Sequence, residues 1–204
     1  MTLNLEKCLI SKSEIPWWGM RISDKGVTPD PEKVKALEHA SPPTSKDEVI
    51  SFLCMAQSNK DFIPNLSSKT VYLRQLTKKH ARFNWTEQCK REFEELCMAL
   101  KNDTLLRYYD PTKQTFIFVD AHKTGIAAIL AQGKNEEDAK PVSYASRATT
   151  DVERRYPQID LEALAVDYGL RRYRFFLVGS PEITVCTDPV SYTHLRAHET
   201  CPYR

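Results

Sequence analysis

The sequence predicts a mixed fold of the α+β / α/β class, in which a small helical region precedes a mixed β-sheet. Over residues 28–103 the apolar residues recur at a spacing of three and four, which is typical of amphipathic helices. After residue 104 the pattern changes to short apolar runs between turn residues, which indicates strands. Short links join the runs at 115–120, 125–132 and 141–146, so we expect three antiparallel strands.

A fourth strand is expected after a long helix. Residues 158–179 read "QIDLEALAVDYGLRRYRFFLVG", and this pattern predicts a helix that ends at Gly179. The run from Glu182 to Asp188 then predicts a strand. Because a strand reached through a helix usually returns by a right-handed crossover, we expect it to lie parallel to the first strand of the sheet.

The region before the sheet carries recognisable start signals. Residues 5–28 alternate apolar and polar side chains, which predicts two short strands. Asp30 is placed to cap a following helix, and Ser45 with Glu48 forms a capping box for a second one. Two further helices are expected, around residues 71–76 and after Thr86.

The bulk composition excludes several classes of protein. The formal net charge is +2, so no overall basic field calls for nucleic acid, and two local basic runs, at 76–82 and 169–176, are interpreted as solvated helix faces. The six cysteines form no C-x-x-C pair, which predicts reduced thiols in an intracellular protein. No apolar run of about 18 residues occurs, so no membrane span is expected.

Three carboxylates are predicted to meet at one edge of the sheet. Asp120 follows "FIFV" at the end of the first strand, and Asp188 follows "TVCT" at the end of the fourth. If these strands are parallel, both aspartates lie at the same carboxyl edge, where α/β proteins build their sites. Glu162 lies one turn into the intervening helix, at the border of the apolar stripe that packs on the sheet.

Such a cluster predicts a divalent cation. Each pair of carboxylates would repel by about 4 kcal/mol at roughly 4 Å and an effective dielectric constant near 20. Oxygen ligands favour Mg²⁺ or Mn²⁺ over zinc, and two such ions could promote phosphodiester hydrolysis. The spacing also allows simpler roles: Asp120 could cap a turn, Glu162 could be a solvated acid of the first helical turn, and His122 could be a surface turn residue.

Several segments together resemble the Pol polyproteins of gypsy-type LTR retrotransposons. They read "WWGMRISDKGVTPDPEKVKAL", "SFLCMAQSNKDFIPNLS", "LLRYYDPTKQTFIFVDAHKTGIAAILAQ" and "PVSYASRATTDVERRYPQIDLEALAV". The resemblance is dense from about Leu5 to Asp188. The chain departs from the family at Trp17-Trp18-Gly19, where Phe-Leu-Gly is usual, and at Ser58 and Asn59, where tyrosines usually stand.

The resemblance implies a division of the chain. Residues 1–27 are similar to the end of a reverse transcriptase palm with a primer-grip-like hairpin, and residues 28–104 to a helical thumb and connection region. Residues 105–189 are similar to an RNase H-like domain that is truncated at its C-terminal side. Residues 190–204 are interpreted as a non-native tail, because their back-translation resembles a transposase-type sequencing adaptor. We therefore assign no metal site to the histidines in this tail.

The resemblance also implies an activity and its residues. The RNase H acids of the family match Asp120, Glu162 and Asp188, which would bind Mg²⁺ or Mn²⁺ and cleave the RNA strand of an RNA–DNA hybrid. The implied partners are the hybrid or a template–primer and the rest of the Pol polyprotein, in the cytoplasm or a virus-like particle. Contacts with nucleic acid are expected at four further residues, namely Trp18, Gly19, Arg147 and Arg172.

Two departures limit the expected activity. The chain contains no Asp-Asp pair, so the Tyr-x-Asp-Asp motif of the polymerase centre is missing and no polymerase activity is expected. The fourth RNase H aspartate of the family has no match after Asp188, so we expect an incomplete second metal site, low stability and a chain that is largely inactive as a nuclease. The alternative is a decayed or non-catalytic fragment that binds nucleic acid without cleaving it.

Overall fold

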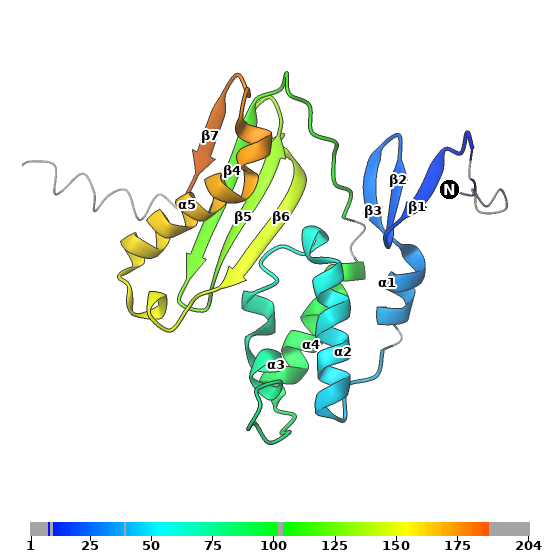
Figure 1. Ribbon diagram of the computed structural model, residues 1–204, viewed down its shortest axis with the longest axis vertical. Helices are drawn as coiled ribbons and strands as arrows, with labels where there is room; N and C mark the ends of the chain where they lie inside the picture. The colour runs from blue at the N-terminus through cyan, green and yellow to red at the C-terminus, as the bar shows by residue number, and fades with distance from the viewer. Residues whose placement is uncertain (1–7, 9, 39, 102–103, 188–204) are drawn as a thin grey trace, which may run out of the picture.

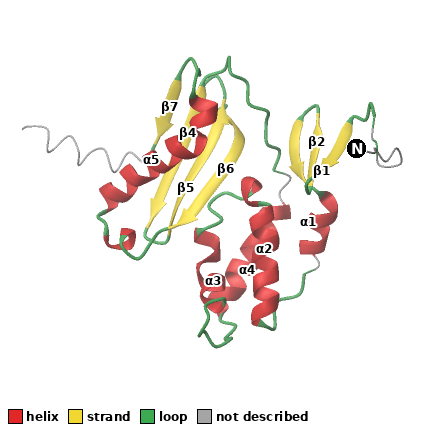
Figure 2. Cartoon of the chain, in the orientation of Figure 1, coloured by secondary structure: helices red, strands yellow, loops and turns green. Residues whose placement is uncertain are grey.

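The computed structural model describes residues 8, 10–38, 40–101 and 104–187, and it confirms the mixed fold class. The described chain contains a three-stranded antiparallel sheet, a group of helices, and a four-stranded mixed sheet covered by one long helix. Figure 1 shows the four-stranded sheet above the helices, with the smaller sheet beside them, and Figure 2 shows the same division by type of element.

The small sheet contains one strand more than the sequence predicts. Its strands are β1 (Glu14–Trp17), β2 (Met20–Ser23) and β3 (Gly26–Pro29), paired in that order. The extra turn lies at Trp18 and Gly19, whose φ angles are 51° and 79°. Two successive positive φ angles are typical of a tight hairpin turn. The sequence prediction missed this turn because tryptophan is not a usual turn residue.

The helices of the middle region begin where the start signals predict. They are α1 (Pro31–Glu38), α2 (Lys46–Ser58), α3 (Val71–Leu76) and α4 (Glu87–Lys101), with short 3₁₀ turns η2 (Lys60–Phe62) and η3 (Ser68–Thr70). The amide of Glu48 donates to Ser45 Oγ at 3.3 Å, as in a capping box. In a full capping box the Glu48 carboxylate would accept from the amide of Ser45. Here it accepts from the amide of Thr44, at 2.7 Å. The helices share one core, formed by Val49, Phe52, Ala56, Ile63, Leu66, Leu73, Leu76, Cys89, Phe93 and Leu96.

The topology of the larger sheet is as predicted. Its strands are β4 (Thr115–His122), β5 (Gly125–Gln132), β6 (Lys140–Ala148) and β7 (Ile183–Cys186), in the order β6-β5-β4-β7. The first three pair antiparallel, and β7 pairs parallel to β4. The helix α5 (Gln158–Leu177) makes the crossover between β6 and β7.

One face of this sheet is buried by α5. Ile117, Val119 and Ala128 from the strands share a core with Leu161 and Ala165 from the helix. The approach is close where α5 has Gly169, since a Cβ there would lie 3.1 Å from methyl groups of Ile117 and Val119. The Tyr173 hydroxyl then donates toward the carbonyls of Ala128, at 3.1 Å, and Ser143, at 2.9 Å. The helix is therefore fixed to three strands.

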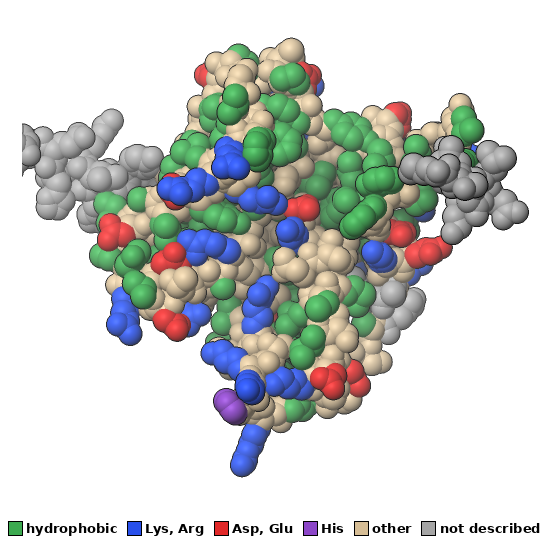
Figure 3. Space-filling view, in the orientation of Figure 1, with side chains coloured by type: hydrophobic (Ala, Val, Ile, Leu, Met, Phe, Trp, Pro, Cys, Tyr) green, Lys and Arg blue, Asp and Glu red, His purple; other side chains and the backbone are tan. Residues whose placement is uncertain are grey.

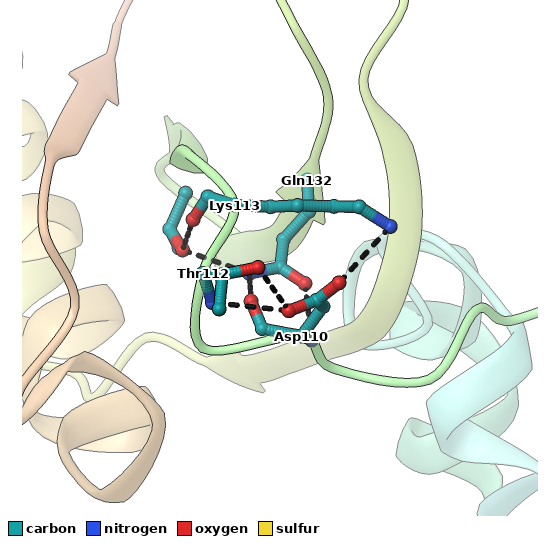
Figure 4. A network of polar contacts seen from close by, with 5 residues as sticks. Asp110, Thr112, Lys113 and Gln132 are labelled. Atoms are coloured by element: carbon teal, nitrogen blue, oxygen red, sulfur yellow. Dashed lines mark hydrogen bonds and ion pairs between the residues drawn. The ribbon is translucent and has the colours of Figure 1, made fainter.

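A polar network fixes the point where the chain enters β4. The side chain of Gln132, at the end of β5, accepts from the amide of Asp110 at 2.8 Å and donates to its carbonyl at 2.9 Å (Figure 4). The same Nε2 lies 3.0 Å from Thr115 Oγ1 on β4. The carboxylate of Asp110 closes its own turn through the amide of Thr112, at 3.0 Å, and Lys113 Nζ, at 3.2 Å. These contacts define the register of the strand that carries Asp120.

Candidate metal centre beside the end of the β4–β7 pairing

The sequence prediction placed Asp120 at the end of its strand. In the structure it lies two residues before the end of β4. The antiparallel pairing of β4 with β5 continues as far as His122 and Gly125, whereas its parallel pairing with β7 extends, within the described residues, to Phe118 and Cys186. Asp120 therefore lies two residues beyond the last pair of these parallel strands that the structure describes. Such a point is a usual place for a site in an α/β sheet.

The Asp120 carboxylate has two close partners. Asn65 Nδ2 donates to its Oδ2 at 3.2 Å, and His122 Nε2 lies 3.3 Å from the same oxygen. The side chain is 46% exposed, on the face of the sheet opposite to α5, because Val119 and Ala121 point into the core under that helix. His122 is 63% exposed and directly precedes the turn, which agrees with the surface position predicted for it.

Glu162 is buried, and only one of its carboxylate oxygens is paired. The residue is 8% exposed, so it is not the solvated acid that the sequence left as an alternative. Its Oε1 accepts from Gln158 Nε2 at 2.6 Å, and the same Nε2 donates to the carbonyl of Ala121 at 2.9 Å. Because Ala121 follows Asp120 directly, Gln158 connects the helix acid to the strand that carries the aspartate.

The second carboxylate oxygen shows that the residues fit a cation. Within the described part of the chain, Glu162 Oε2 is buried and has no hydrogen-bond partner. An unpaired buried carboxylate oxygen is costly unless a cation or a proton neutralises it. Oxygen-only donors of this kind suit Mg²⁺ or Mn²⁺.

The third predicted acid, Asp188, lies outside the described residues. Among those that the structure describes, no group of three acidic, histidine or cysteine side chains is gathered as a complete metal site. The strand that leads to Asp188 has the parallel register that the prediction required, with Cys186 opposite Phe118. The assignment of Asp188 as a ligand thus stays a prediction.

Arg147, predicted to contact nucleic acid, is engaged within the protein. It makes a two-pronged ion pair with Glu153, at 2.8 and 2.9 Å, and its guanidinium lies 5.6 Å from the ring centroid of Tyr168. This pairing lowers the pKa of Glu153 to about 2 and raises that of Arg147. Arg172 lies 3.8 Å from Asp61 and is 43% exposed.

The other two residues predicted to contact nucleic acid form the tip of the β1–β2 hairpin. Trp18 is 86% exposed. A Cβ at Gly19 would lie only 2.0 Å from Lys33 Nζ, so the turn and α1 approach closely there. The structure thus exposes an aromatic side chain on a turn with two positive φ angles. The contact of Trp18 and Gly19 with nucleic acid stays a prediction.

Sequence reasoning missed a basic groove beside the acids. A cavity of about 430 Å³ lies between α3 and the β4–β5 turn, with Arg74, Lys78, Lys123 and Arg154 among its lining residues. No acid is among the described residues that line it. On the face seen in Figure 3, Lys and Arg side chains lie over α5 and over the helices below it. The basic residues come from separate elements, so no single run in the sequence predicts the groove.

Comparison with known proteins identifies the region around the acids. Residues 85–185 match the family model described as an RNase H-like domain found in reverse transcriptase. The Pol polyprotein of transposon 412 from Drosophila melanogaster is 32% identical over 195 residues, which is 96% of this chain and 16% of that protein. The Tf2-3 polyprotein of Schizosaccharomyces pombe is 29% identical over 189 residues, or 92% of this chain and 14% of that protein.

Solved structures agree with this fold. A foamy viral protease–reverse transcriptase in complex with double-stranded DNA superposes with a TM-score of 0.73 at 21% identity, over 91% of this chain and 32% of the other. A foamy viral protease–reverse transcriptase in complex with an RNA/DNA hybrid gives the same TM-score and identity, over 95% and 26%. In the described part of this chain, no helix has the length and apolar character needed to cross a membrane. Residues 85–185 therefore form an RNase H-like domain of the kind found in reverse transcriptase, and the chain is similar over 96% of its length to a retrotransposon Pol polyprotein.

Proposed function

We propose that this chain carries part of the nuclease centre of a retrotransposon reverse transcriptase, the enzyme that hydrolyses the RNA strand of an RNA–DNA hybrid with the help of divalent metal ions. The observation that carries the proposal is the buried, unpaired Oε2 of Glu162, on a helix that Gln158 connects to the strand of Asp120. Asp188 would complete the ligand set from the end of the parallel strand.

The residues of the centre would have separate tasks. Asp120 and Glu162 would hold Mg²⁺ or Mn²⁺, and Gln158 would keep the Glu162 carboxylate oriented by holding Oε1 and leaving Oε2 free. When bound, the metal would supply charge stabilisation for the phosphodiester group and lower the pKa of a bound water. The protein groups would align the phosphate at the edge of β4.

We propose that the hybrid passes along the basic groove. Lys123 lies in the turn between β4, which carries Asp120, and β5, so the groove adjoins the candidate metal centre. Nucleic-acid backbones bind mainly through Lys and Arg contacts to phosphates, and hybrids are read by shape, phosphate and 2′-OH. A foamy viral relative of the same fold binds an RNA/DNA hybrid, which supports this class of ligand.

The proposed domain organisation follows the same reasoning. Residues 1–27 would correspond to the end of the palm, 28–104 to the thumb and connection, and 105–189 to the nuclease domain. The chain spans 16% of the transposon 412 polyprotein and 14% of the Tf2-3 polyprotein, so the remaining steps of reverse transcription would be carried out elsewhere in such polyproteins.

Metal binding is the first test of this function. Isothermal titration calorimetry measures the affinity of the 204-residue chain for Mn²⁺. In Asp120→Asn this affinity should fall at least about tenfold, which is a loss of about 1.4 kcal/mol in binding free energy. The matched control is Asp138→Asn, since Asp138 is an exposed acid in the β5–β6 connection; its affinity should equal that of the unaltered chain. Hybrid binding without any dependence of metal affinity on Asp120 would instead favour a non-catalytic binding module.

A further inference from the structure

The contact between Asn65 and Asp120 joins parts of the chain that are 55 residues apart in sequence. Asn65 lies in the helical region, between η2 and η3, and Asp120 lies on β4. The amide Nδ2 donates to Oδ2, the same oxygen that His122 approaches. In the described part of the chain, no hydrogen bond reaches the other oxygen, Oδ1. The aspartate is therefore held on one side and open on the other.

The backbone of Asn65 is fixed by its surroundings. Its φ angle is 54°, in the left-handed region that asparagine adopts more readily than most other residues. Its carbonyl accepts from the amides of Ser68, at 3.1 Å, and Lys69, at 3.2 Å. Ile63 and Leu66 on either side are 1% and 3% exposed and belong to the helical core. The side-chain amide is thus presented to Asp120 from a rigid turn.

The residues after Asn65 follow a row of side chains across the sheet. Asp120 lies opposite Ala127 in the pairing of β4 with β5, and Ala127 lies opposite Ser146 in the pairing of β5 with β6. Residues directly opposite one another point to the same face. The amide of Ser67 donates to Ser146 Oγ at 3.0 Å. The segment 65–67 therefore crosses three strands, with the small Ala127 beneath it.

Gly125 allows this segment to approach the sheet. A Cβ at Gly125 would lie 2.7 Å from Ser67 Oγ and 2.9 Å from Ser68 Oγ. Distances this short do not occur between a real Cβ and an oxygen, so any side chain at this position would push the two serine side chains away. Contacts at both ends of the segment and a glycine beside it indicate a docked interface rather than a chance contact.

We propose that Asn65 is a positioning residue of the nuclease centre, which anchors Asp120 through Oδ2 and leaves Oδ1 free to bind a cation. This inference rests on the proposed function. It goes further because it makes the helical region part of the site, so the sheet and α5 alone do not hold the aspartate in its working orientation.

The test removes the amide and keeps the turn. Asn65→Gly is suitable because glycine accepts a positive φ angle at little cost. Its affinity for Mn²⁺, measured by calorimetry on the full chain, should fall roughly 3- to 30-fold, the range for losing a partly exposed hydrogen bond to a carboxylate. Ser146→Ala is the matched control, since it removes the other contact of the segment and none to Asp120. Its Mn²⁺ affinity should be unchanged even if its melting temperature falls.

Two further measurements keep the outcome clear. Asn65→Ser serves as a second variant if circular dichroism shows that Asn65→Gly is unfolded. In the unaltered chain, substoichiometric Mn²⁺ should broaden the side-chain amide signals of Asn65 before those of Asn135, which lies in the exposed β5–β6 connection.

The possible results separate the two proposals. Unchanged Mn²⁺ affinity in a folded Asn65 variant, or broadening at Asn135 first, overturns the role of Asn65. If Asp120→Asn still weakens binding in that case, the proposed function stands. If Asp120→Asn binds Mn²⁺ as the unaltered chain does, the metal centre and the role of Asn65 both fall.

Discussion

At the scale of single residues, the hydrogen-bond partners of charged side chains distinguish candidate cation ligands from structural ion pairs. Glu162 presents an unpaired carboxylate oxygen, whereas Arg147 and Glu153 pair with each other through two hydrogen bonds. These charged side chains lie on or beside α5. The unpaired oxygen of Glu162 is expected of a cation ligand, whereas the pairing of Arg147 with Glu153 is expected of a structural ion pair.

The unpaired oxygen of Glu162 predicts a specific response to metal. Glu162→Gln removes a buried charge, so without metal its melting temperature should equal or exceed that of the unaltered chain. Saturating Mn²⁺ should raise the melting temperature of the unaltered chain, by ligand linkage, and leave that of Glu162→Gln unchanged. Thermal melts with and without Mn²⁺ measure both effects. Glu137→Gln, an exposed change in the β5–β6 connection, should keep the full response, and an equal rise in Glu162→Gln would rule out Glu162 as a ligand.

The ion pair of Glu153 predicts a pH dependence. Hydrogen bonds and charge from Arg147 lower the pKa of the Glu153 carboxyl from 4.5 to about 2 in the folded chain. A lowered folded-state pKa stabilises the fold above pH 4.5, and this stabilisation is lost as the pH falls from 4.5 toward 2. Urea unfolding over this window should show that the stability gap between the unaltered chain and Glu153→Gln narrows with acid. A gap that stays constant would show that the pair does not control the titration.

At the scale of elements, the local signals in the sequence predicted most of the helices and strands. Asp30, Ser45 and Gly179 mark helix ends in the structure as expected: the amide of Glu32 bonds to Asp30 at 3.1 Å, and Gly179 has a φ angle of 84°. These signals act through neighbours in sequence, which is why they can be read without a structure. The parallel register of β4 and β7 was also predictable, because a helical crossover constrains direction and hand.

The elements also show what sequence could not supply. Glu92, on α4, accepts from the amides of Tyr72 and Leu73 at 2.9 Å each, and so caps α3 from a distance of about twenty residues. Asn65 reaches Asp120 across a similar tertiary contact. Both depend on how elements pack, and neither asparagine nor glutamate at these positions carries a local pattern. The candidate acids were chosen from expected strand ends and family motifs, whereas the residues that contact them were not foreseen.

The cap that Glu92 provides for α3 predicts that two glutamates of α4, Glu92 and Glu95, contribute differently to the free energy of unfolding. Glu92 is 8% exposed and burial raises its pKa, yet its carboxylate satisfies two backbone amides. Glu92→Ala should cost about 2 kcal/mol in the free energy of unfolding, because two buried donors lose their partner. Glu95→Ala, an exposed change on the same helix, should stay within about 0.5 kcal/mol. Denaturant unfolding compares the two, and equal losses would refute the capping role.

At the scale of the whole molecule, the helical region and the larger sheet are joined where the chemistry is expected. Segment 65–67 lies over the row that contains Asp120, and the basic groove opens between α3 and the turn after β4. The proposed site would therefore draw on both regions. This arrangement agrees with a chain whose similarity to the transposon 412 polyprotein extends over 96% of its length rather than over residues 85–185 alone.

The groove predicts how nucleic-acid binding should respond to salt. Lys78→Ala and Lys123→Ala should each weaken binding of a labelled RNA–DNA hybrid, and each should reduce the slope of log affinity against log salt by about 0.7 to 0.9, as for one lost phosphate contact. Lys134→Ala is the control, since Lys134 is exposed in the β5–β6 connection, outside the groove residues. Fluorescence anisotropy at several salt concentrations gives the slopes. Equal slopes in all variants would place the hybrid elsewhere.

The most direct measurement is a crystal of the chain soaked in Mn²⁺ and recorded at the manganese absorption edge. A cation held by Asp120 and Glu162 should give an anomalous peak about 2.0 to 2.3 Å from oxygens of both carboxylates, with Oε2 of Glu162 as one ligand. Saturating Mn²⁺ with no peak between these side chains, or with a peak only elsewhere on the surface, would contradict the proposed metal centre.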